Sequence, residues 1–153
     1  MILLLIRHGQ AAKPPGETAL RLTARGQKEA AQAAQALRER QIRPTCLWHS
    51  PKARAIETAD ILAEKLGFPS MDREQKKELA PEGNPRKIYE DLMAERPPTL
   101  ALVSHLPFLE KLAFLIQEQM GHPLELRFPT AGIQAFRFDG GWEKLFDFEP
   151  DAL

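Results

Sequence analysis

The chain has 153 residues, of which 43% are hydrophobic, so it is long enough to bury one full-sized core. Basic and acidic residues both number 21, and the zero net charge argues against a bulk attraction to nucleic acid or to an anionic membrane. The longest apolar run, residues 1–6, is too short to cross a bilayer and lacks the flanks of a signal peptide. We expect one cytoplasmic domain over residues 1–153, with no internal disulfide because Cys46 is the only cysteine.

The first third of the chain predicts two strands and a helix. Residues 1–6 are typical of a buried strand, because they are few, apolar and followed by charge and glycine. Residues 11–22 contain two prolines and a glycine and predict a loop. Thr23 suits the N-cap of a helix running to about Arg40. The apolar segment 45–48 predicts a second buried strand.

The next helix has signals at both ends. Ser50 suits its N-cap, Pro51 its first position and Gly67 the residue just past its end. The charged residues 72–78 and the Pro-containing region 81–83 then predict an exposed connection.

The remaining elements follow the same logic. Asn84 and Pro85 predict the start of a helix that the prolines at 97 and 98 stop. Residues 99–103 predict a third strand, and Pro107 predicts the start of another helix. Residues 133–138 and 142–148, joined by Asp-Gly-Gly, predict a hairpin. Together the elements predict an α/β fold with a mostly parallel sheet, helices on both faces and an antiparallel C-terminal edge hairpin.

Three polar segments follow three of the predicted strands: Arg7-His8-Gly9, residues 50–54 and Ser104-His105. In such sheets, ligands bind outside the carboxyl ends of the strands, so we expect these segments to meet. Two arginines and two histidines at one place indicate a site that handles phosphate.

His8 is the candidate nucleophile of that site. A neutral imidazole near pH 7 can accept a phosphoryl group, provided that one ring nitrogen is held so that the other faces phosphorus. Gly9 would allow a close approach of the backbone. Taken alone, His8 would more often be a strand-end histidine bonded to the backbone, and it is the neighbouring motifs that favour the catalytic interpretation.

Arg7, Arg54 and His105 are the candidate phosphate ligands. A guanidinium group fits the equatorial oxygens of a phosphoryl group better than an ammonium group does. Arg54 would lie in the first turn of its helix, where N–H groups and the helix dipole also attract anions. A protonated His105 could donate to a phosphate oxygen. A metal site is the competing interpretation, but no histidine or cysteine spacing typical of one is present, and the arginines would repel a cation.

These motifs resemble those of the histidine phosphatase superfamily, whose fold is phosphoglycerate mutase-like. The resemblance rests on Arg7-His8-Gly9, on Ser50-Pro51 with Arg54-Ala55 and Thr58, and on Ser104-His105, in that order. Leu22-Thr23 followed by Gly26 is similar to the family's segment at the start of its first helix. The short chain and Ser104-His105-Leu106-Pro107 resemble the small SixA-type phosphohistidine phosphatases.

The resemblance implies roles for these residues. His8 would accept the phosphoryl group, while Arg7, Arg54 and His105, with Gly9 and Ser50, would bind the phosphate, and no metal or other cofactor would be needed. Glu78 best resembles the general acid of larger relatives, and Glu82 is the second choice, although Glu78 could equally be a solvated charge. Gln10, which follows the first motif, cannot serve as an acid.

The expected substrate is phosphohistidine on a partner protein, such as a phosphotransfer domain. The phosphoramidate bond needs less acid catalysis than an ester, and a chain too short for an inserted lid would leave an open site. One alternative is a phosphatase acting on a small phosphorylated molecule, a sugar phosphate or nucleotide-like ester. The other is a non-catalytic module that binds phosphorylated partners.

Overall fold

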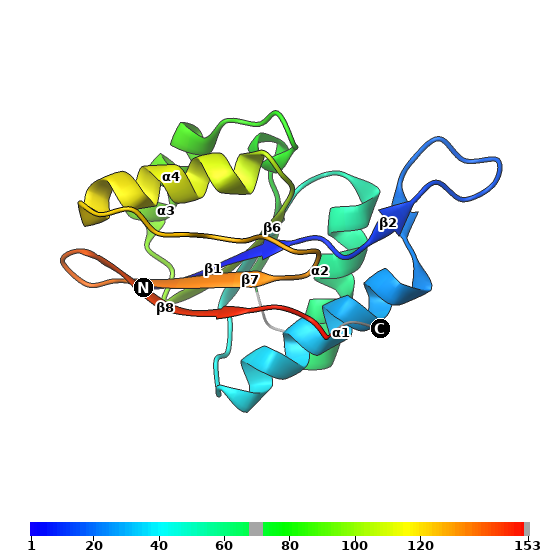
Figure 1. Cartoon of the computed structure of the whole chain (residues 1–153), viewed down its shortest axis with the longest axis horizontal. Helices are drawn as coiled ribbons and strands as arrows, with labels where there is room; N and C mark the ends of the chain where they lie inside the picture. The colour runs from blue at the N-terminus through cyan, green and yellow to red at the C-terminus, as the bar shows by residue number, and fades with distance from the viewer. Residues whose placement is uncertain (68–71, 152–153) are drawn as a thin grey trace.

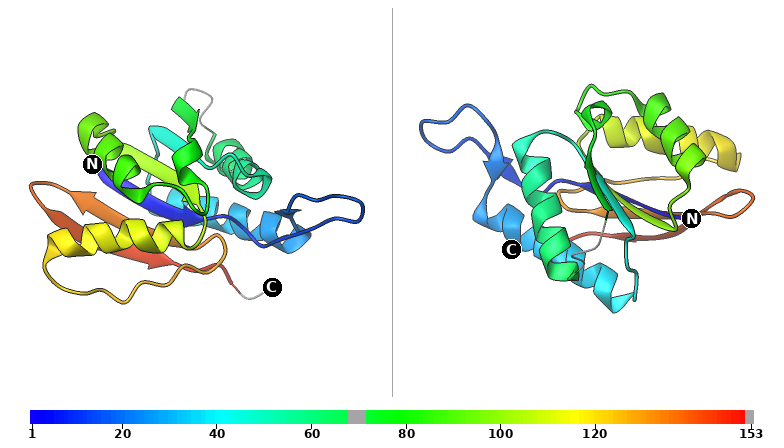
Figure 2. Two further views of the ribbon diagram at one scale, coloured as in Figure 1. Left: turned by 90° about the horizontal axis from the view of Figure 1, so that it is seen from above. Right: turned by 180° about the vertical axis from the view of Figure 1, so that it is seen from behind.

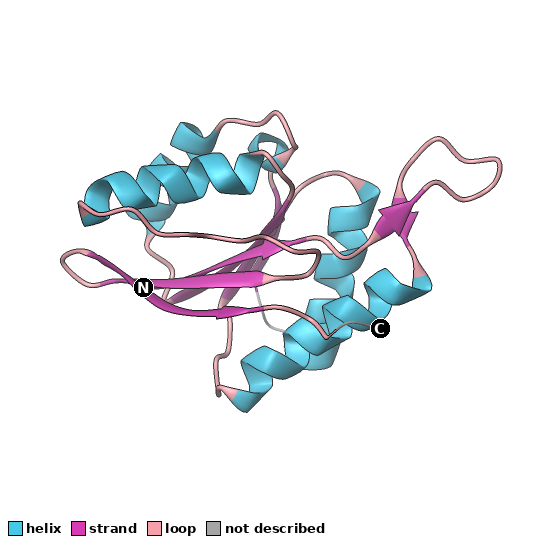
Figure 3. Ribbon diagram, viewed as in Figure 1, coloured by secondary structure: helices cyan, strands magenta, loops and turns pink. Residues whose placement is uncertain are grey.

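A six-stranded sheet forms the centre of the computed structural model, which describes residues 1–67 and 72–151 (Figures 1 and 3). In spatial order the strands are β5 (Asp72–Gln75), β4 (Cys46–His49), β6 (Thr99–Ser104), β1 (Ile2–Arg7), β7 (Ile133–Phe138) and β8 (Trp142–Phe148). The pairs β1–β6, β4–β6 and β4–β5 are parallel, whereas β7 is antiparallel to β1 and to β8. The mostly parallel sheet and its antiparallel C-terminal edge are therefore confirmed.

Helices cover both faces of the sheet, as predicted (Figure 2). The helices α1 (Ala24–Glu39) and α2 (Ala53–Leu66) pack on one face, where Leu4, Ile6, Leu37 and Leu62 belong to one buried cluster. The helices α3 (Pro85–Glu95) and α4 (Phe108–Met120) pack on the other face. Successive residues of β1 point to opposite faces, so this strand contributes to both cores and is buried throughout its middle.

Most of the predicted helix ends are confirmed. The Thr23 side chain accepts a hydrogen bond from the amide of Gly26, and that of Asn84 accepts one from the amide of Lys87. Gly67 ends α2 in the left-handed conformation, with φ of 67°, which glycine adopts without steric cost. Among the described residues, no helix has both the length and the apolar composition needed to span a membrane.

The predicted start of α2 is wrong by two residues. Lys52, not Ser50, is the N-cap, and the helix begins at Ala53 rather than Pro51. The Ser50 hydroxyl instead accepts the amide of Lys52 in a turn before the helix and contacts His105.

Two predicted connections contain regular structure. The loop predicted over residues 11–22 includes the two-residue strands β2 (Ala11–Ala12) and β3 (Arg21–Leu22), which pair with each other. The connection predicted over 72–78 contains β5 and most of a 3-10 helix, η1 (Lys77–Leu79). All four residues of β5 are exposed, and an edge strand of this kind carries polar side chains, so no apolar pattern marks it.

Candidate active site

Three neighbouring strands end together and bring the predicted residues to one edge of the sheet. Arg7 lies opposite Ser104 in the β1–β6 register, and His49 lies opposite Val103 in the β4–β6 register. The rings of His8 and His105, each following its strand, have centroids 5.0 Å apart. The sequence motifs therefore meet as expected.

The backbone after β1 is held at every amide from residue 7 to residue 10. The amide of Arg7 donates to the Gly132 carbonyl, and that of His8 donates to the Ser104 carbonyl. The next two amides donate to side chains: Gly9 to the Thr58 hydroxyl at 3.0 Å, and Gln10 to the Glu29 carboxylate at 2.8 Å. Since α1, α2, β6 and the segment before β7 all take part, the position of His8 is fixed by four parts of the chain.

His8 is buried, and one of its ring nitrogens is already engaged. Nδ1 lies 2.7 Å from the carbonyl oxygen of Gly9, and because a carbonyl only accepts, Nδ1 must carry the proton. Burial, together with the charges of Arg54 and Arg7, lowers the pKa of His8 from 6.5 to about 4. The ring is therefore neutral at pH 7, with its lone pair on Nε2, which is the state that a nucleophile requires.

His105 is held by Ser50. Nε2 of His105 lies 2.7 Å from the Ser50 hydroxyl, which also accepts the Lys52 amide, so the hydroxyl proton can be given to Nε2. That arrangement leaves the ring proton on Nδ1, a buried atom without a partner among the described residues. Burial and the charges of His8 and Arg54 lower the pKa of His105 to about 3.

Both predicted arginines face this site. Arg7 donates from one terminal nitrogen to the Phe128 carbonyl at 2.9 Å, and its buried Nε has no partner among the described residues. Arg54 lies in the first turn of α2, as predicted. Burial lowers the pKa of each, and the charge of Glu82 partly offsets this effect at Arg54. The charges of both guanidinium groups act on the neutral His8 imidazole, a combination with the chemistry to attract an anion and to act on it as a nucleophile.

Gly9 and Ser50 fill roles different from those expected of phosphate ligands. The amide and carbonyl of Gly9 are bonded to Thr58 and His8, and a Cβ on Gly9 would lie 2.5 Å from the Gly26 carbonyl oxygen. The expected close approach of the backbone is therefore an approach to α1. Ser50 is fully buried and contacts His105.

The two candidate acids, Glu78 and Glu82, lie around the end of η1, which packs on the edge of the sheet next to the site. The Ser104 hydroxyl donates to the Leu79 carbonyl at 2.6 Å and so anchors this segment. The charge of Glu82 partly offsets the lowering of the Arg54 pKa by burial, whereas the pKa of Lys87 is raised chiefly by its hydrogen bond to Asp91 and only in small part by the charge of Glu78.

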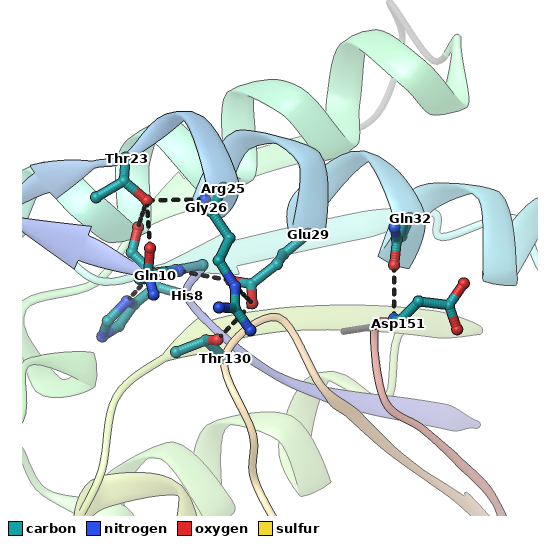
Figure 4. A network of polar contacts seen from close by, with 10 residues as sticks. His8, Gln10, Thr23, Arg25, Gly26, Glu29, Gln32, Thr130 and Asp151 are labelled. Atoms are coloured by element: carbon teal, nitrogen blue, oxygen red, sulfur yellow. Dashed lines mark hydrogen bonds and ion pairs between the residues drawn. The ribbon is translucent and has the colours of Figure 1, made fainter. Parts of the chain in front are cut away.

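Sequence reasoning missed Glu29 and Thr130, which complete the support of the site (Figure 4). Glu29 is 4% exposed, and its second carboxylate oxygen accepts the Thr130 hydroxyl at 2.9 Å. Glu29 lies three residues after Gly26 and four before Ala33, on the buried face of α1. A carboxylate within an otherwise apolar stripe was the signal that could have identified it.

A groove of about 610 Å³ runs beside the site between the start of α3 and one side of α4. Its lining includes Pro107, two residues after His105, and Glu110, whose charge raises the pKa of Arg7. Glu110 and Phe114 also line a smaller hollow of about 170 Å³ on the other side of α4. Phe114 is 58% exposed and is the exposed large hydrophobic residue of the described chain.

The described residues contain no group of three or more His, Cys, Asp or Glu side chains arranged to hold a metal ion. The donors that converge here are instead two imidazoles and two guanidinium groups, a set that suits an anion.

Comparisons with known proteins point to one family. Residues 3–82 match the model of the histidine phosphatase superfamily (branch 1). A segment of 68 residues is 41% identical to phosphoglycerate mutase 1 of Saccharomyces cerevisiae, and it covers 41% of this chain and 28% of that protein. The chain thus matches well under two thirds of this relative's length.

Solved structures resemble the whole chain. The protein histidine phosphatase SixA, complexed with tungstate, superposes with a TM-score of 0.85 and 26% identity over 98% of this chain and 97% of its own. A SixA described as a putative phosphohistidine phosphatase, from Agrobacterium tumefaciens, gives 0.80 and 24% over 98% of each chain. A mycobacterial glucosyl-3-phosphoglycerate phosphatase gives 0.70 and 18% over 94% and 96%.

Proposed function

Since the chain belongs to the histidine phosphatase superfamily and resembles SixA over 98% of its length, we propose that it hydrolyses phosphohistidine on a partner protein through a phosphohistidine intermediate on His8. The observation that carries this proposal is the hydrogen bond from Nδ1 of His8 to Gly9, which leaves Nε2 with the lone pair. We also propose that residues 1–153 form a single domain and that the protein works in the cytoplasm.

The proposed reaction has two displacements. In the first, Nε2 of His8 attacks phosphorus, the bond from phosphorus to the substrate imidazole breaks, and the substrate leaves as a histidine side chain. In the second, water attacks phosphorus, the bond to Nε2 breaks, and inorganic phosphate is released. The neutral His8 of the resting site suits the first step, because a protonated ring has no lone pair to donate.

Three cationic or polarisable groups would bind the phosphoryl oxygens. Arg7 brings a buried Nε–H and His105 a buried Nδ1–H, neither with a partner among the described residues, so a phosphoryl oxygen would satisfy each. Arg54 would supply a third donor from the first turn of α2. Ser50 would act through His105, and Gly9 through His8. The structure of SixA with tungstate, a tetrahedral oxyanion like phosphate, supports a site for such an anion in this fold.

Two features favour a protein-borne substrate. The site opens beside a groove and an exposed phenylalanine on α4, which a small substrate would not need. In addition, the leaving group of a phosphoramidate departs as a neutral imidazole when its other nitrogen is protonated, which relaxes the need for a strong general acid.

The decisive experiment compares phosphate release from a phosphohistidine-bearing protein with release from a small phosphomonoester, in the presence of a chelator. We expect the wild type to prefer the phosphohistidine protein, and His8→Ala to abolish turnover of both substrates. A phosphorylated enzyme, stable to alkali and labile to acid, should be trapped in the wild type alone. Activity in His8→Ala would rule out the covalent mechanism.

A small-molecule phosphatase is the second candidate. The fold is shared with a glucosyl-3-phosphoglycerate phosphatase, and part of the chain resembles a phosphoglycerate mutase. Much faster turnover of a phosphomonoester than of phosphohistidine would favour this candidate. Stable binding of a phosphorylated protein without turnover, unaffected by His8→Ala, would indicate a binding module instead.

The general acid, if the reaction uses one, is proposed to be Glu78 or Glu82. Glu82 acts electrostatically on Arg54, so we expect Glu82→Gln to lower turnover of a phosphomonoester more than Glu78→Gln does. Turnover of phosphohistidine should fall less, since its leaving group needs less help. The opposite ranking of the two variants would assign the role to Glu78.

A further inference from the structure

The proposed nucleophile, His8, is connected through hydrogen bonds to Glu29, a buried carboxylate on α1. The two proposed displacements assign no role to Glu29. Oε1 of Glu29 accepts the Gln10 amide at 2.8 Å, and Oε2 accepts the Thr130 hydroxyl at 2.9 Å. Arg25, which is half-exposed, approaches Oε2 at 3.6 Å. Burying a carboxylate costs free energy unless hydrogen bonds compensate it. Glu29 is only 4% exposed, so its hydrogen-bond partners are needed to hold it there.

One peptide group joins Glu29 to His8. The Gln10 amide that donates to Glu29 and the Gly9 carbonyl that accepts from Nδ1 of His8 belong to the same peptide unit. In a trans peptide the N–H and C=O point in opposite directions, so one end of the group faces the carboxylate and the other faces the imidazole. The result is a continuous chain of two hydrogen bonds, drawn in part in Figure 4.

We propose that Glu29 is a positioning residue for His8 and acts through the peptide group between Gly9 and Gln10. A charged acceptor on the amide polarises the peptide and strengthens the hydrogen bond at its carbonyl. That bond keeps the proton on Nδ1 and the lone pair on Nε2. The inference rests on the proposed function, because it assigns a partner to the proposed nucleophile.

The carboxylate also matches the charge that the reaction creates. Once Nε2 carries the phosphoryl group and Nδ1 keeps its proton, the imidazole ring is formally cationic. Glu29 already raises the pKa of His8 against the effects of burial and of the two arginines, so its charge favours a cationic ring. In a catalytic triad, a carboxylate bonded directly to the histidine fixes its tautomer and stabilises its cationic form. We propose that Glu29 does the same for His8 through the intervening peptide group.

The second oxygen of Glu29 steadies the other side of His8. Thr130, which it holds, precedes Ala131, whose amide donates to the His8 carbonyl at 3.1 Å. Ala131 has φ of 55°, a conformation that is strained for alanine and persists only where neighbouring contacts hold it. Glu29 therefore ties to α1 both the segment that follows His8 and the segment whose amide binds the His8 carbonyl.

The test uses Glu29→Ala and Glu29→Gln, with Glu57→Ala as the matched control. Glu57 is also a helical carboxylate that accepts one backbone amide, that of Leu22, and pairs with one arginine, Arg21. The peptide group that it holds has no bond to His8. The main readout is the tautomer of His8, measured by nitrogen-15 NMR of the imidazole in the absence of substrate, with resonances assigned by His8→Ala.

We expect the wild type and Glu57→Ala to show the Nδ1–H tautomer alone, and Glu29→Ala to show a mixture of both tautomers. Glu29→Ala should lower kcat by about 10- to 100-fold, the range typical of outer-shell groups that orient the ligands of a metal, with KM changed less than about twofold. Glu29→Gln keeps an oxygen acceptor for the Gln10 amide, so it should retain the tautomer and most of kcat. Its Nδ1–H proton should nevertheless resonate upfield of the wild type, because the acceptor has lost its charge.

The inference is overturned if Glu29→Ala matches Glu57→Ala in both tautomer and kcat. If Glu29→Ala does not fold, an Nδ1–H resonance in Glu29→Gln identical to the wild type overturns it instead. The tautomer is read without substrate, so a protein that shows the expected tautomers and fails to hydrolyse phosphohistidine would contradict the proposed function and leave the role of Glu29 intact.

Discussion

At His8, burial and a single hydrogen bond act together to set the reactive state of the ring. Burial disfavours the charged imidazolium, and the bond from Nδ1 to Gly9 decides which nitrogen of the neutral ring keeps its lone pair. His105 is treated differently, because Ser50 engages its Nε2 and leaves Nδ1 for a ligand. Two histidines 5.0 Å apart thus differ in which nitrogen they present.

The first prediction concerns the titration of His8. Its pKa is lowered to about 4, so the neutral form should persist as the pH falls through 6.5, where a histidine of the unfolded chain takes up its proton. Proton NMR of the His8 ring should therefore show its inflection near pH 4, with the resonance assigned by His8→Ala. An inflection at 6 or above would mean that the nucleophile is partly protonated in the resting site.

The second prediction concerns Arg54. Removing a group that stabilises charge in a transition state commonly costs about 100-fold or more in turnover, and we expect Arg54→Ala to fall in that range. Arg54→Lys should recover only part of this loss, since an ammonium group lacks the fork that spans two oxygens. Arg73→Ala, which removes an arginine paired with Asp60 on the surface, should keep wild-type turnover under the same assay. Equal effects of the two alanine variants would exclude the phosphate-binding role.

At the scale of the elements, helices and strands marked by a run or a repeat of apolar residues were predicted from the sequence. Strands without such a pattern were not. The strands that became β1, β4 and β6 are short and apolar, so their order and their shared carboxyl edge followed from the pattern. The strand β5 carries only exposed polar residues and receives its backbone partners from β4, which no local pattern reveals. A strand that forms only because its backbone pairs with a neighbouring strand therefore cannot be predicted from its own side chains.

The same distinction separates the predicted and the missed residues of the site. His8, Arg7, Arg54 and His105 were predicted because each lies at the end of a predicted element within a recognisable motif. Glu29 was missed because it lies inside a helix, where a glutamate is usually solvated, and its partners are 19 and 101 residues away along the chain. These contacts of Glu29 depend on how α1 packs against distant segments, which the local sequence does not reveal.

The third prediction tests that packing. A Cβ on Gly26 would collide with the Gln10 carbonyl oxygen, so Gly26→Ala should push α1 away from the segment after His8. We expect a loss of about 1–3 kcal/mol in the free energy of unfolding, measured in urea, together with reduced turnover. Gly141→Ala is the control, because a Cβ there has open space, and it should leave both quantities within error. Wild-type stability in Gly26→Ala would show that the helix and the segment can move apart freely.

On the scale of the whole molecule, the candidate active site and the α3–α4 face are joined through the start of α4, which follows His105. Pro107, two residues after His105, lines the groove, and the charge of Glu110, on α4, acts on Arg7. Beyond them Phe114 stands between two hollows. We expect a partner protein that presents phosphohistidine to this site to lie against this face, where an exposed aromatic ring offers an apolar contact.

The last prediction follows from this continuity. Phe114→Asp places a charge where the partner protein would bury an apolar side chain, so kcat/KM for a phosphohistidine protein should fall by about 10-fold or more. Phe114→Leu keeps an apolar side chain and should retain most of that activity. Turnover of a small phosphoramidate should be the same in the wild type and in both variants, since Phe114 lies outside the phosphate site. Equal losses on the large and the small substrate would mean that Phe114→Asp disturbs the site itself, whereas no loss on either would mean that the partner does not bind at Phe114.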